Sequence, residues 1–193
     1  NDWKSSYFGN IESFEFHLTE QRHYILKDLI NDLESNTSTI AFGPIGVGKS
    51  VSYMLFLVYL RYILNYNVIY YNFLRIPPIH GFMYELIRQI LFIIYKVKNK
   101  NKTILKQACN IAHLLQSKPF PDIIGKLSKF YKLENMIIIF DQLNFLYPHN
   151  KSDARKNDDN MKALRNQLDL KNLSSMAKTF MCYSNDNEEV KKL

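Results

Sequence analysis

The spacing of apolar residues along this chain alternates between a strand pattern and a helix pattern. Short runs of consecutive apolar residues predict buried strands at 39–42, 67–73, 136–140 and 178–183. Longer segments with apolar residues three and four positions apart predict helices at 14–33, 49–64, 82–97, 104–115, 122–133 and 159–170. Strands that alternate with helices indicate a parallel sheet covered on both faces, so we expect an α/β fold.

The polar residues between these segments predict caps and connectors. Thr19 and Thr103 are the expected caps of the first and fourth helices, because a hydroxyl can accept a bond from a free helical N–H group. The alternating lysines of 96–102 form a basic connector, and 149–160 reads as a surface loop.

Composition limits the class of protein without choosing a function. The chain has 193 residues, of which 47% are apolar and 22% charged, so we expect one folded domain rather than a disordered chain. The net charge of +7 favours nucleic acid, nucleotides or an anionic membrane as partners. The longest apolar run, 51–64, is interrupted by Arg61 and is too short to span a bilayer, so no membrane is expected.

Cysteine and histidine contribute little to the candidate chemistry. Cys109 and Cys182 are far apart in apolar surroundings, and we expect two buried thiols rather than a disulfide framework or a metal quartet. The five histidines show no metal-ligand spacing. The chain starts at Asn1 without Met, and we expect one domain over 1–193 within a longer protein, with a leading segment at 1–13 and a tail at 186–193.

The strongest chemical signal is a glycine-rich loop between a predicted strand and a predicted helix. Its residues follow the pattern G-x-x-x-x-G-K-[ST] without a substitution, and with the next position they give the expected nucleotide contacts: Gly43, Pro44, Ile45, Gly46, Val47, Gly48, Lys49, Ser50 and Val51. Glycines let successive N–H groups face one concavity at a helix N-terminus, where an anion is favoured. Lys49 is expected to reach the β- and γ-phosphates of ATP, and the Ser50 hydroxyl to bind Mg²⁺.

A second acidic group is needed to complete such a magnesium site. Asp141 follows the apolar strand 136–140, at the strand end where ligands bind in open α/β sheets, and we expect it to bind Mg²⁺ together with Ser50. The next residue, Gln142, can orient a water molecule but cannot take a proton from it. We therefore expect slow hydrolysis or hydrolysis that depends on a partner. A packing or capping role for Gln142 remains the alternative.

Weaker candidates surround these two motifs. If the last strand lies between the strand before the glycine loop and the strand before Asp141, then Ser184 and Asn185 face the γ-phosphate, and Asn185 could hold the attacking water. An ordinary strand end is the alternative. Arg155 and Arg165 are candidate charge-stabilising arginines, although a solvated helix face also explains Arg165. The lysines of 96–102 could contact a phosphate backbone, and 189–191 weakly resembles a nuclease E-x-K pattern.

Taken together, GPIGVGKS at 43–50, a helix before it, IIIFDQLN at 137–144 and a late strand ending in Ser-Asn resemble the P-loop ATPase module of Crinkler effectors. The resemblance covers roughly 14–185. It implies a three-layer P-loop NTPase sandwich of the AAA or STAND kind, with a mostly parallel sheet of the additional-strand type. That sheet would need a fifth strand and a helical lid beyond Leu193, so we expect this domain to be incomplete at its C-terminus.

The same resemblance supplies the biological expectation. Crinkler effectors are secreted proteins that enter host cells, and members are linked to the host nucleus, so DNA and self-association are candidate partners. The expected function is an ATP- and Mg²⁺-binding module with weak ATPase activity that switches or drives an adjoining nuclease-like domain. Two alternatives stay open: a non-hydrolysing nucleotide sensor or DNA-binding scaffold, and a small nucleotide or metabolite kinase.

Overall fold

The computed structural model describes residues 18–35, 37–44, 46–73, 79–148 and 158–185. The side chains of Ile79, His80 and Asn185 lie outside the description. Several expectations from the sequence therefore fall on undescribed positions, namely the leading segment 1–13, Ile45, Arg155, most of the loop 149–160, the tail 186–193 and the pattern at 189–191.

Strands and helices alternate through most of the chain, as the apolar spacing predicted. The strands are β1 (Thr39–Pro44), β2 (Asn67–Asn72), β3 (Met136–Asp141) and β4 (Lys178–Asn185). The α-helices are α2 (Glu20–Glu34), α3 (Lys49–Val58), α4 (Ile79–Val97), α5 (Lys102–Leu114), α6 (Phe120–Tyr131), α7 (Asp159–Leu168) and α8 (Leu170–Met176). A π-helix η1 (Tyr59–Ile63) continues α3, and a 3₁₀ turn η3 (Leu143–Phe145) follows β3.

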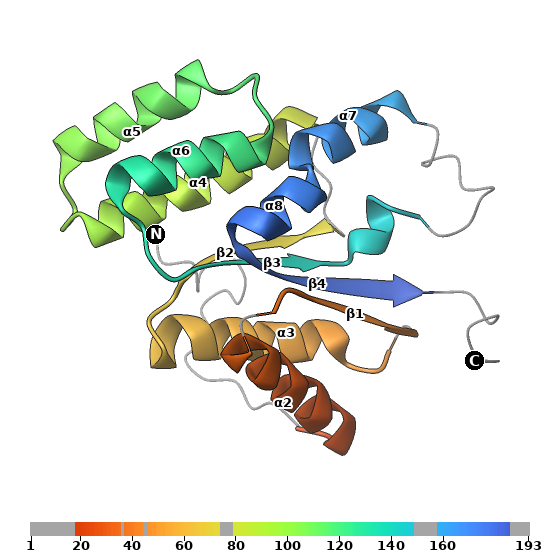
Figure 1. The fold of residues 1–193 in the computed structure, drawn as a ribbon. Coiled ribbons are helices and arrows are strands. Elements are labelled where there is room, and N and C mark those ends of the chain that lie inside the picture. Colours follow the sequence, from red (N-terminus) through yellow and green to blue (C-terminus); the bar gives the residue numbers. More distant parts are fainter. Residues whose placement is uncertain (1–17, 36, 45, 74–78, 149–157, 186–193) are drawn as a thin grey trace, which may run out of the picture.

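The four described strands form one parallel sheet in the order β1-β4-β3-β2 (Figure 1). The strand β4 lies between β1 and β3, which is the order that the sequence analysis required for the end of β4 to face the glycine loop. The described strands all run the same way. The glycine loop after β1, Asp141 at the end of β3 and Ser184 near the end of β4 therefore lie together where the strands end, at the C-terminal side of the sheet.

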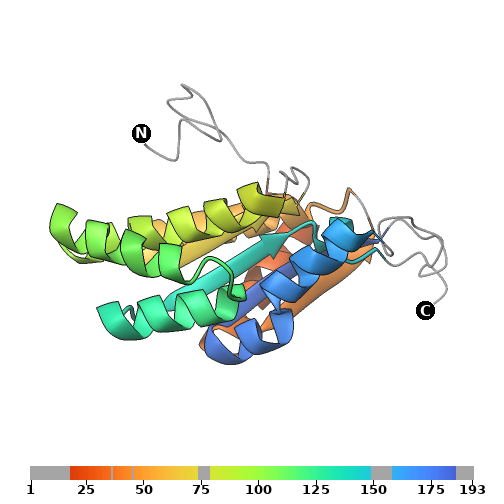
Figure 2. The same cartoon turned by 90° about the horizontal axis from the view of Figure 1, so that it is seen from above.

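Helices cover both faces of this sheet. In Figure 1, α4 to α8 lie above it and α2 and α3 below it, and Figure 2 shows the upper helices from above. Alternate strand residues supply two separate cores. On β3, for example, Ile138 and Phe140 join the core under α4, α6, α7 and α8, while Ile137 and Ile139 join the core over α2 and α3. This is a three-layer α/β architecture, in which runs of buried residues on both faces explain the unbroken apolar strands.

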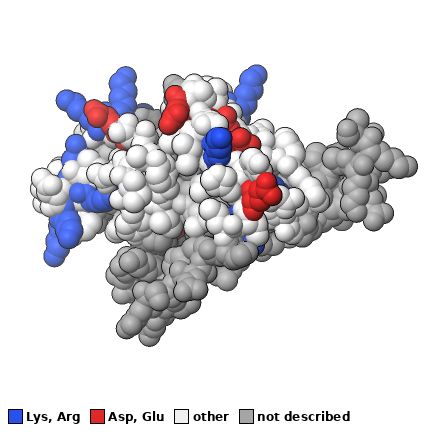
Figure 3. Space-filling view, turned by 90° about the horizontal axis from the view of Figure 1, so that it is seen from below, with Lys and Arg blue, Asp and Glu red and all other residues white. Residues whose placement is uncertain are grey.

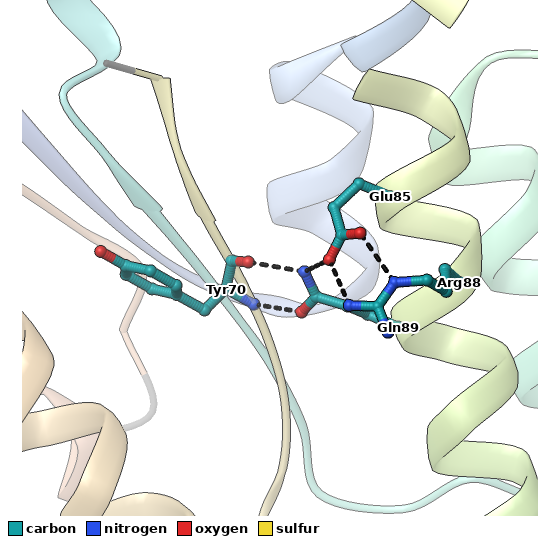
Figure 4. Close-up of polar contacts among 4 residues, drawn as sticks. All are labelled: Tyr70, Glu85, Arg88 and Gln89. Atoms are coloured by element: carbon teal, nitrogen blue, oxygen red, sulfur yellow. Dashed lines mark hydrogen bonds and ion pairs between the residues drawn. The ribbon is translucent and has the colours of Figure 1, made fainter. Parts of the chain in front are cut away.

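The two edges of the sheet differ. At the β2 edge, the Gln89 amide of α4 accepts a 2.9 Å bond from Tyr70 N and donates a 2.8 Å bond to Tyr70 O, so it pairs with the strand as another backbone would (Figure 4). Arg61 covers the same edge through a 2.7 Å bond from Nη2 to Val68 O. At the other edge, Ile40 and Phe42 of β1 are 47% and 60% exposed.

Some local expectations were wrong. Thr103 does not cap α5; Asn101 does, because its Oδ1 accepts bonds from the N–H groups of Thr103 and Ile104. The helix expected at 159–170 ends at Leu168, since Asp169 has φ +42° and its side chain caps the unexpected helix α8. The Thr19 cap is confirmed, with its Oγ1 accepting a bond from Arg22 N.

One of the two thiols expected to be buried is exposed. Cys109 lies on the solvent side of α5, because neighbouring Ala108 and Ala112 take the positions that face the core. Phe130 of α6 is also exposed and packs edge-on against the ring of Tyr131, which occupies the buried position instead. The second thiol, that of Cys182 on β4, is buried as expected.

Candidate functional site

The glycine loop connects the end of β1 to the start of α3. Gly46 has φ +87° and Gly48 has φ +88°, and both values lie in the left-handed region that side chains other than glycine rarely adopt. Gly48 is also the N-cap residue of α3, so the free N–H groups of the first helical turn begin here. The sequence pattern therefore produces the backbone conformation for which its glycines were expected.

Lys49 lies across this loop rather than in solvent. Its residue is only 4% exposed, and its Nζ donates bonds of 2.9 Å to Gly43 O and 2.6 Å to Pro44 O. A nearly buried ammonium group beside a helix N-terminus makes the loop electropositive. An anion is the ligand that such a site would stabilise.

The second motif meets the first at Ser50. The Ser50 hydroxyl donates a 3.0 Å bond to Asp141 Oδ1, and Gln142 Nε2 donates a 2.9 Å bond to the same hydroxyl. Gln142 takes φ +61°, so the chain turns sharply directly after β3 and brings this amide back toward α3. The structure thus brings together Lys49, Ser50, Asp141 and Gln142, the four described residues with the most specific predicted roles.

Asp141 is fully buried among hydrogen-bond donors. Besides Ser50, its carboxylate receives bonds from Tyr70 (Oη to Oδ2, 3.4 Å) and Asn72 (Nδ2 to Oδ2, 3.2 Å), both on β2. The thiol of Cys182 on β4 donates to it from the other side. Burial raises the pKa of Asp141 above its usual value, and the bonds from Cys182 and Ser50 partly offset this rise.

Cys182 is affected by the same contact. Its pKa is raised to about 12, first by burial and then by the negative charge of Asp141. The thiol therefore stays protonated near neutral pH, and in that state it can donate to the carboxylate.

The end of β4 lies beside the glycine loop. In the parallel register, Ser184 pairs with Gly43 and Asn185 with Pro44, so the backbone of these two residues lies beside the start of the glycine loop. Ser184 N donates a 3.3 Å bond to Asn144 Oδ1, which links the end of β4 to the turn after Asp141. The side chain of Asn185, the proposed holder of water, lies outside the described residues.

The weaker candidates lie elsewhere or have other partners. Arg165 Nε donates a 2.8 Å bond to Leu146 O, and its guanidinium lies 5.7 Å from the centre of the Tyr147 ring, so it holds the segment after η3. The basic connector is an exposed turn between α4 and α5, and Lys96 bonds to Asn65, just before β2 begins. The connector therefore lies on the side of the sheet where the strands begin, whereas the glycine loop lies where they end.

The oxygen atoms of Ser50 and Asp141 suit Mg²⁺ bound beside a phosphate better than they suit other metals. Among the described residues, no group of three or more His, Cys, Asp or Glu could hold a metal ion. Magnesium, however, usually keeps several waters and needs only one or two protein oxygens beside the phosphates. Ser50 and Asp141 provide such a pair.

Two further surface features bear on other functions. Within the described part of the chain, no helix has the length and apolar character needed to cross a bilayer. A hollow lined by Gly125, Met176 and Lys178 lies where β3 and β4 begin, whereas Asp141 lies where β3 ends. The hollow therefore does not belong to the site.

Sequence reasoning missed most of the residues around Asp141. Asn72 lies directly opposite Asp141 in the register of β2 and β3, and Tyr70 lies two residues earlier on the same face. Their sequence signal was only that of an apolar strand, and pairing register cannot be inferred from one strand alone. Asn144 was part of the quoted motif IIIFDQLN but had no role assigned to it.

Comparison of the chain with protein-family models, with curated proteins and with solved structures gives no match in any of the three.

Proposed function

We propose that this chain is an ATP- and Mg²⁺-binding P-loop module with slow or partner-dependent ATP hydrolysis. Lys49 and the N–H groups at the start of α3 would bind the phosphates, and Ser50 and Asp141 would hold the metal. The metal would neutralise charge on the phosphates during transfer to water. The module would act as a switch or driver for an adjoining domain, because contacts with the γ-phosphate can order the loops that surround it.

The observation that carries this proposal is the 3.0 Å bond between Ser50 and Asp141. These residues come from two motifs that lie 91 positions apart in the sequence, and the position of one does not determine the position of the other. Their meeting beside a nearly buried lysine supports a phosphate and metal site over a chance glycine-rich turn.

Slow hydrolysis is proposed on the chemistry of Gln142. Its amide donates to Ser50 and has no basic group with which to take a proton from water. It could orient an attacking water only after leaving Ser50. In either arrangement, the Gln142 amide could orient a water molecule but could not act as a general base.

The strand order supports a P-loop sheet of the additional-strand type. One strand, β4, separates the strand of the glycine loop from the strand of Asp141. The exposed apolar residues Ile40 and Phe42 make β1 a suitable neighbour for the further strand that the resemblance to Crinkler ATPase modules implies. The effector role, the host nucleus and self-association are proposed on that resemblance alone.

Calorimetry with ATP, ADP and GTP, each with Mg²⁺, tests the proposal directly. Lys49→Ala is expected to lose most of the affinity for triphosphate, because it removes the cation that faces the phosphates. Lys126→Ala, which removes an exposed lysine of α6, is the matched control and should bind like the native chain. Equal binding by the native chain and Lys49→Ala would refute the site assignment.

A non-hydrolysing nucleotide sensor is the second candidate, and the engagement of Gln142 with Ser50 favours it. The DNA-scaffold form of this candidate rests on the net charge of +7; on the face shown in Figure 3, most of the basic side chains lie toward the left of the view, and the acidic side chains lie mainly nearer its middle. Turnover of ATP with and without duplex DNA separates these candidates. A sensor would bind ATP and release it unchanged under both conditions.

A further inference from the structure

The two oxygen atoms of the Asp141 carboxylate have different hydrogen-bond partners. Oδ1 accepts the 3.0 Å bond from Ser50 of α3, on the side of the glycine loop. Oδ2 accepts bonds from Tyr70 Oη at 3.4 Å and from Asn72 Nδ2 at 3.2 Å, both on β2. The carboxylate is therefore held between α3, which follows the glycine loop, and β2, to which the proposed function gives no role.

Both donors on β2 reach the carboxylate through the pairing of β2 with β3. Asn72 is the last residue of β2 and lies opposite Asp141 in the parallel register. Tyr70 lies two residues earlier, so its side chain leaves the strand on the same face. That face packs against α3, since Tyr70 belongs to the core over α2 and α3. The register therefore places both donors on the side of the sheet that carries Ser50.

The backbone of Tyr70 is fixed by α4. Its N–H and carbonyl groups pair with the Gln89 amide at 2.9 and 2.8 Å, and Gln89 Nε2 also donates a 2.9 Å bond to Glu85 (Figure 4). The residue is only 3% exposed. A hydroxyl on a closely packed ring with a fixed backbone has little freedom, so the fold itself sets its position relative to Asp141.

Fixed donors matter for a carboxylate that binds a metal. The terminal torsion of an aspartate side chain is broad, so an unsupported carboxylate can turn away from a ligand at little cost. Hydrogen bonds to a ligating carboxylate restrict this motion, and removing such bonds typically weakens metal binding about 10- to 100-fold. Here the two bonds to Oδ2 leave Oδ1 directed toward Ser50, the other proposed metal ligand.

We propose that Tyr70 and Asn72 are positioning residues that hold the Asp141 carboxylate in the orientation needed to bind Mg²⁺ beside a phosphate. The inference rests on the proposed function and adds β2 to the elements of that site. Neither residue needs to touch the nucleotide, because both act through the carboxylate.

The test is titration calorimetry of ATP binding, with Mg²⁺ and with a chelator, on the native chain, Tyr70→Phe, Asn72→Ala and the double variant. Tyr70→Phe removes one oxygen atom and keeps the buried ring, so it tests the bond with little change in packing. Asn67→Ala is the matched control, because this amide lies at the other end of β2 and donates a 2.9 Å bond to Glu134 O. Binding with the chelator reports whether the glycine loop is intact in each variant.

The increase in ATP affinity that Mg²⁺ gives should be about 10-fold smaller in each single variant than in the native chain, and smaller still in the double variant. With the chelator, every variant should bind ATP within about twofold of the native chain, because Lys49 and the glycine loop are unchanged. A merely structural role would weaken binding equally under both conditions. Asn67→Ala should match the native chain throughout.

A native increase with Mg²⁺ in both single variants would show that the inference is wrong and would leave the proposed function standing. Equal weakening with Mg²⁺ and with the chelator would also overturn the inference alone. If Mg²⁺ gives the native chain no increase, the metal part of the proposed function fails and the inference fails with it. If the native chain binds no ATP under either condition, both fail completely.

Discussion

Ser50 and Asp141 are separated by 91 positions in the sequence, yet the hydroxyl of one donates to the carboxylate of the other at 3.0 Å. The bond joins the first turn of α3 to the last residue of β3, where the described parallel strands end. Removing either partner should therefore weaken Mg²⁺ binding more than it weakens nucleotide binding.

The first prediction concerns the dependence of ATP affinity on Mg²⁺. In the native chain, ATP should bind more tightly with Mg²⁺ than with a chelator. In Ser50→Ala and Asp141→Asn the ratio of the two dissociation constants should fall toward one, because a metal ligand is lost while Lys49 remains. Titration calorimetry under both conditions gives the ratio. Ser128→Ala, a serine at the opposite edge of the sheet, is the control and should keep the native ratio.

The second prediction concerns the residue after Asp141. Gln142→Glu should raise the rate constant of ATP hydrolysis by at least about 10-fold, because a carboxylate can accept a proton from water and general bases contribute about 10²- to 10⁴-fold. The ATP dissociation constant should change far less than the rate. Phosphate release in single-turnover experiments measures the effect.

A matched charge change separates base catalysis from a general electrostatic effect. Gln116→Glu introduces the same charge at an exposed position after α5 and should leave the rate unchanged. An unchanged rate in Gln142→Glu would show that position 142 is too far from the attacking water to act.

The third prediction concerns the β2 edge and needs no ligand. Gln89→Ala should lower the free energy of unfolding by about 1–3 kcal/mol, because both backbone groups of Tyr70 lose a partner in a partly buried place. Arg88→Ala, on the same helix, removes an ion pair with Glu85, in which the arginine side chain is 57% exposed. It should cost less than about 1 kcal/mol. Urea unfolding of the two variants compares them, and equal losses would contradict the pairing of Gln89 with the strand.

The fourth prediction concerns the two thiols. At pH 8, Cys109 should react with iodoacetamide within minutes, while Cys182 should react only after unfolding. Cys182 is buried and its pKa is raised to about 12, so the reactive thiolate is scarce at pH 8, and its population grows only as the pH rises toward that value. Mass spectrometry of the native chain and of Cys109→Ser counts the modified sites. Rapid labelling of folded Cys109→Ser would place Cys182 at the surface.

Sequence patterns predicted the layers and the central residues of the candidate site, because both depend on strong local signals. The apolar runs predicted the four described strands, and the spacing of Gly43 to Ser50 predicted the loop before α3. Asp141 followed from its position at the end of the most apolar strand. In each case a short stretch of chain carries the whole signal.

What could not be predicted depends on contacts between distant segments. The donors Tyr70 and Asn72 reach Asp141 only because β2 pairs with β3 in one particular register. The Arg22 side chain lies beside Gly48 only because α2 packs on α3. The pairing of Gln89 with Tyr70 could not be predicted either, because in the sequence Gln89 resembles any polar residue of an amphipathic helix. Two local errors were of another kind. Asn101 rather than Thr103 caps α5, and the left-handed turn at Asp169 ends the helix expected at 159–170 and starts α8, which was not predicted.

The unequal edges of the sheet make its growth directional. A strand approaching β2 would have to displace Gln89 and Arg61, which already occupy backbone groups of Tyr70 and Val68. A strand that paired with β1 would bring its own side chains beside the exposed apolar side chains of Ile40 and Phe42. A further strand, whether from this protein or from a second copy, should therefore pair with β1 rather than with β2. A lysine placed at position 40 would be the simplest way to keep isolated preparations of this chain monodisperse.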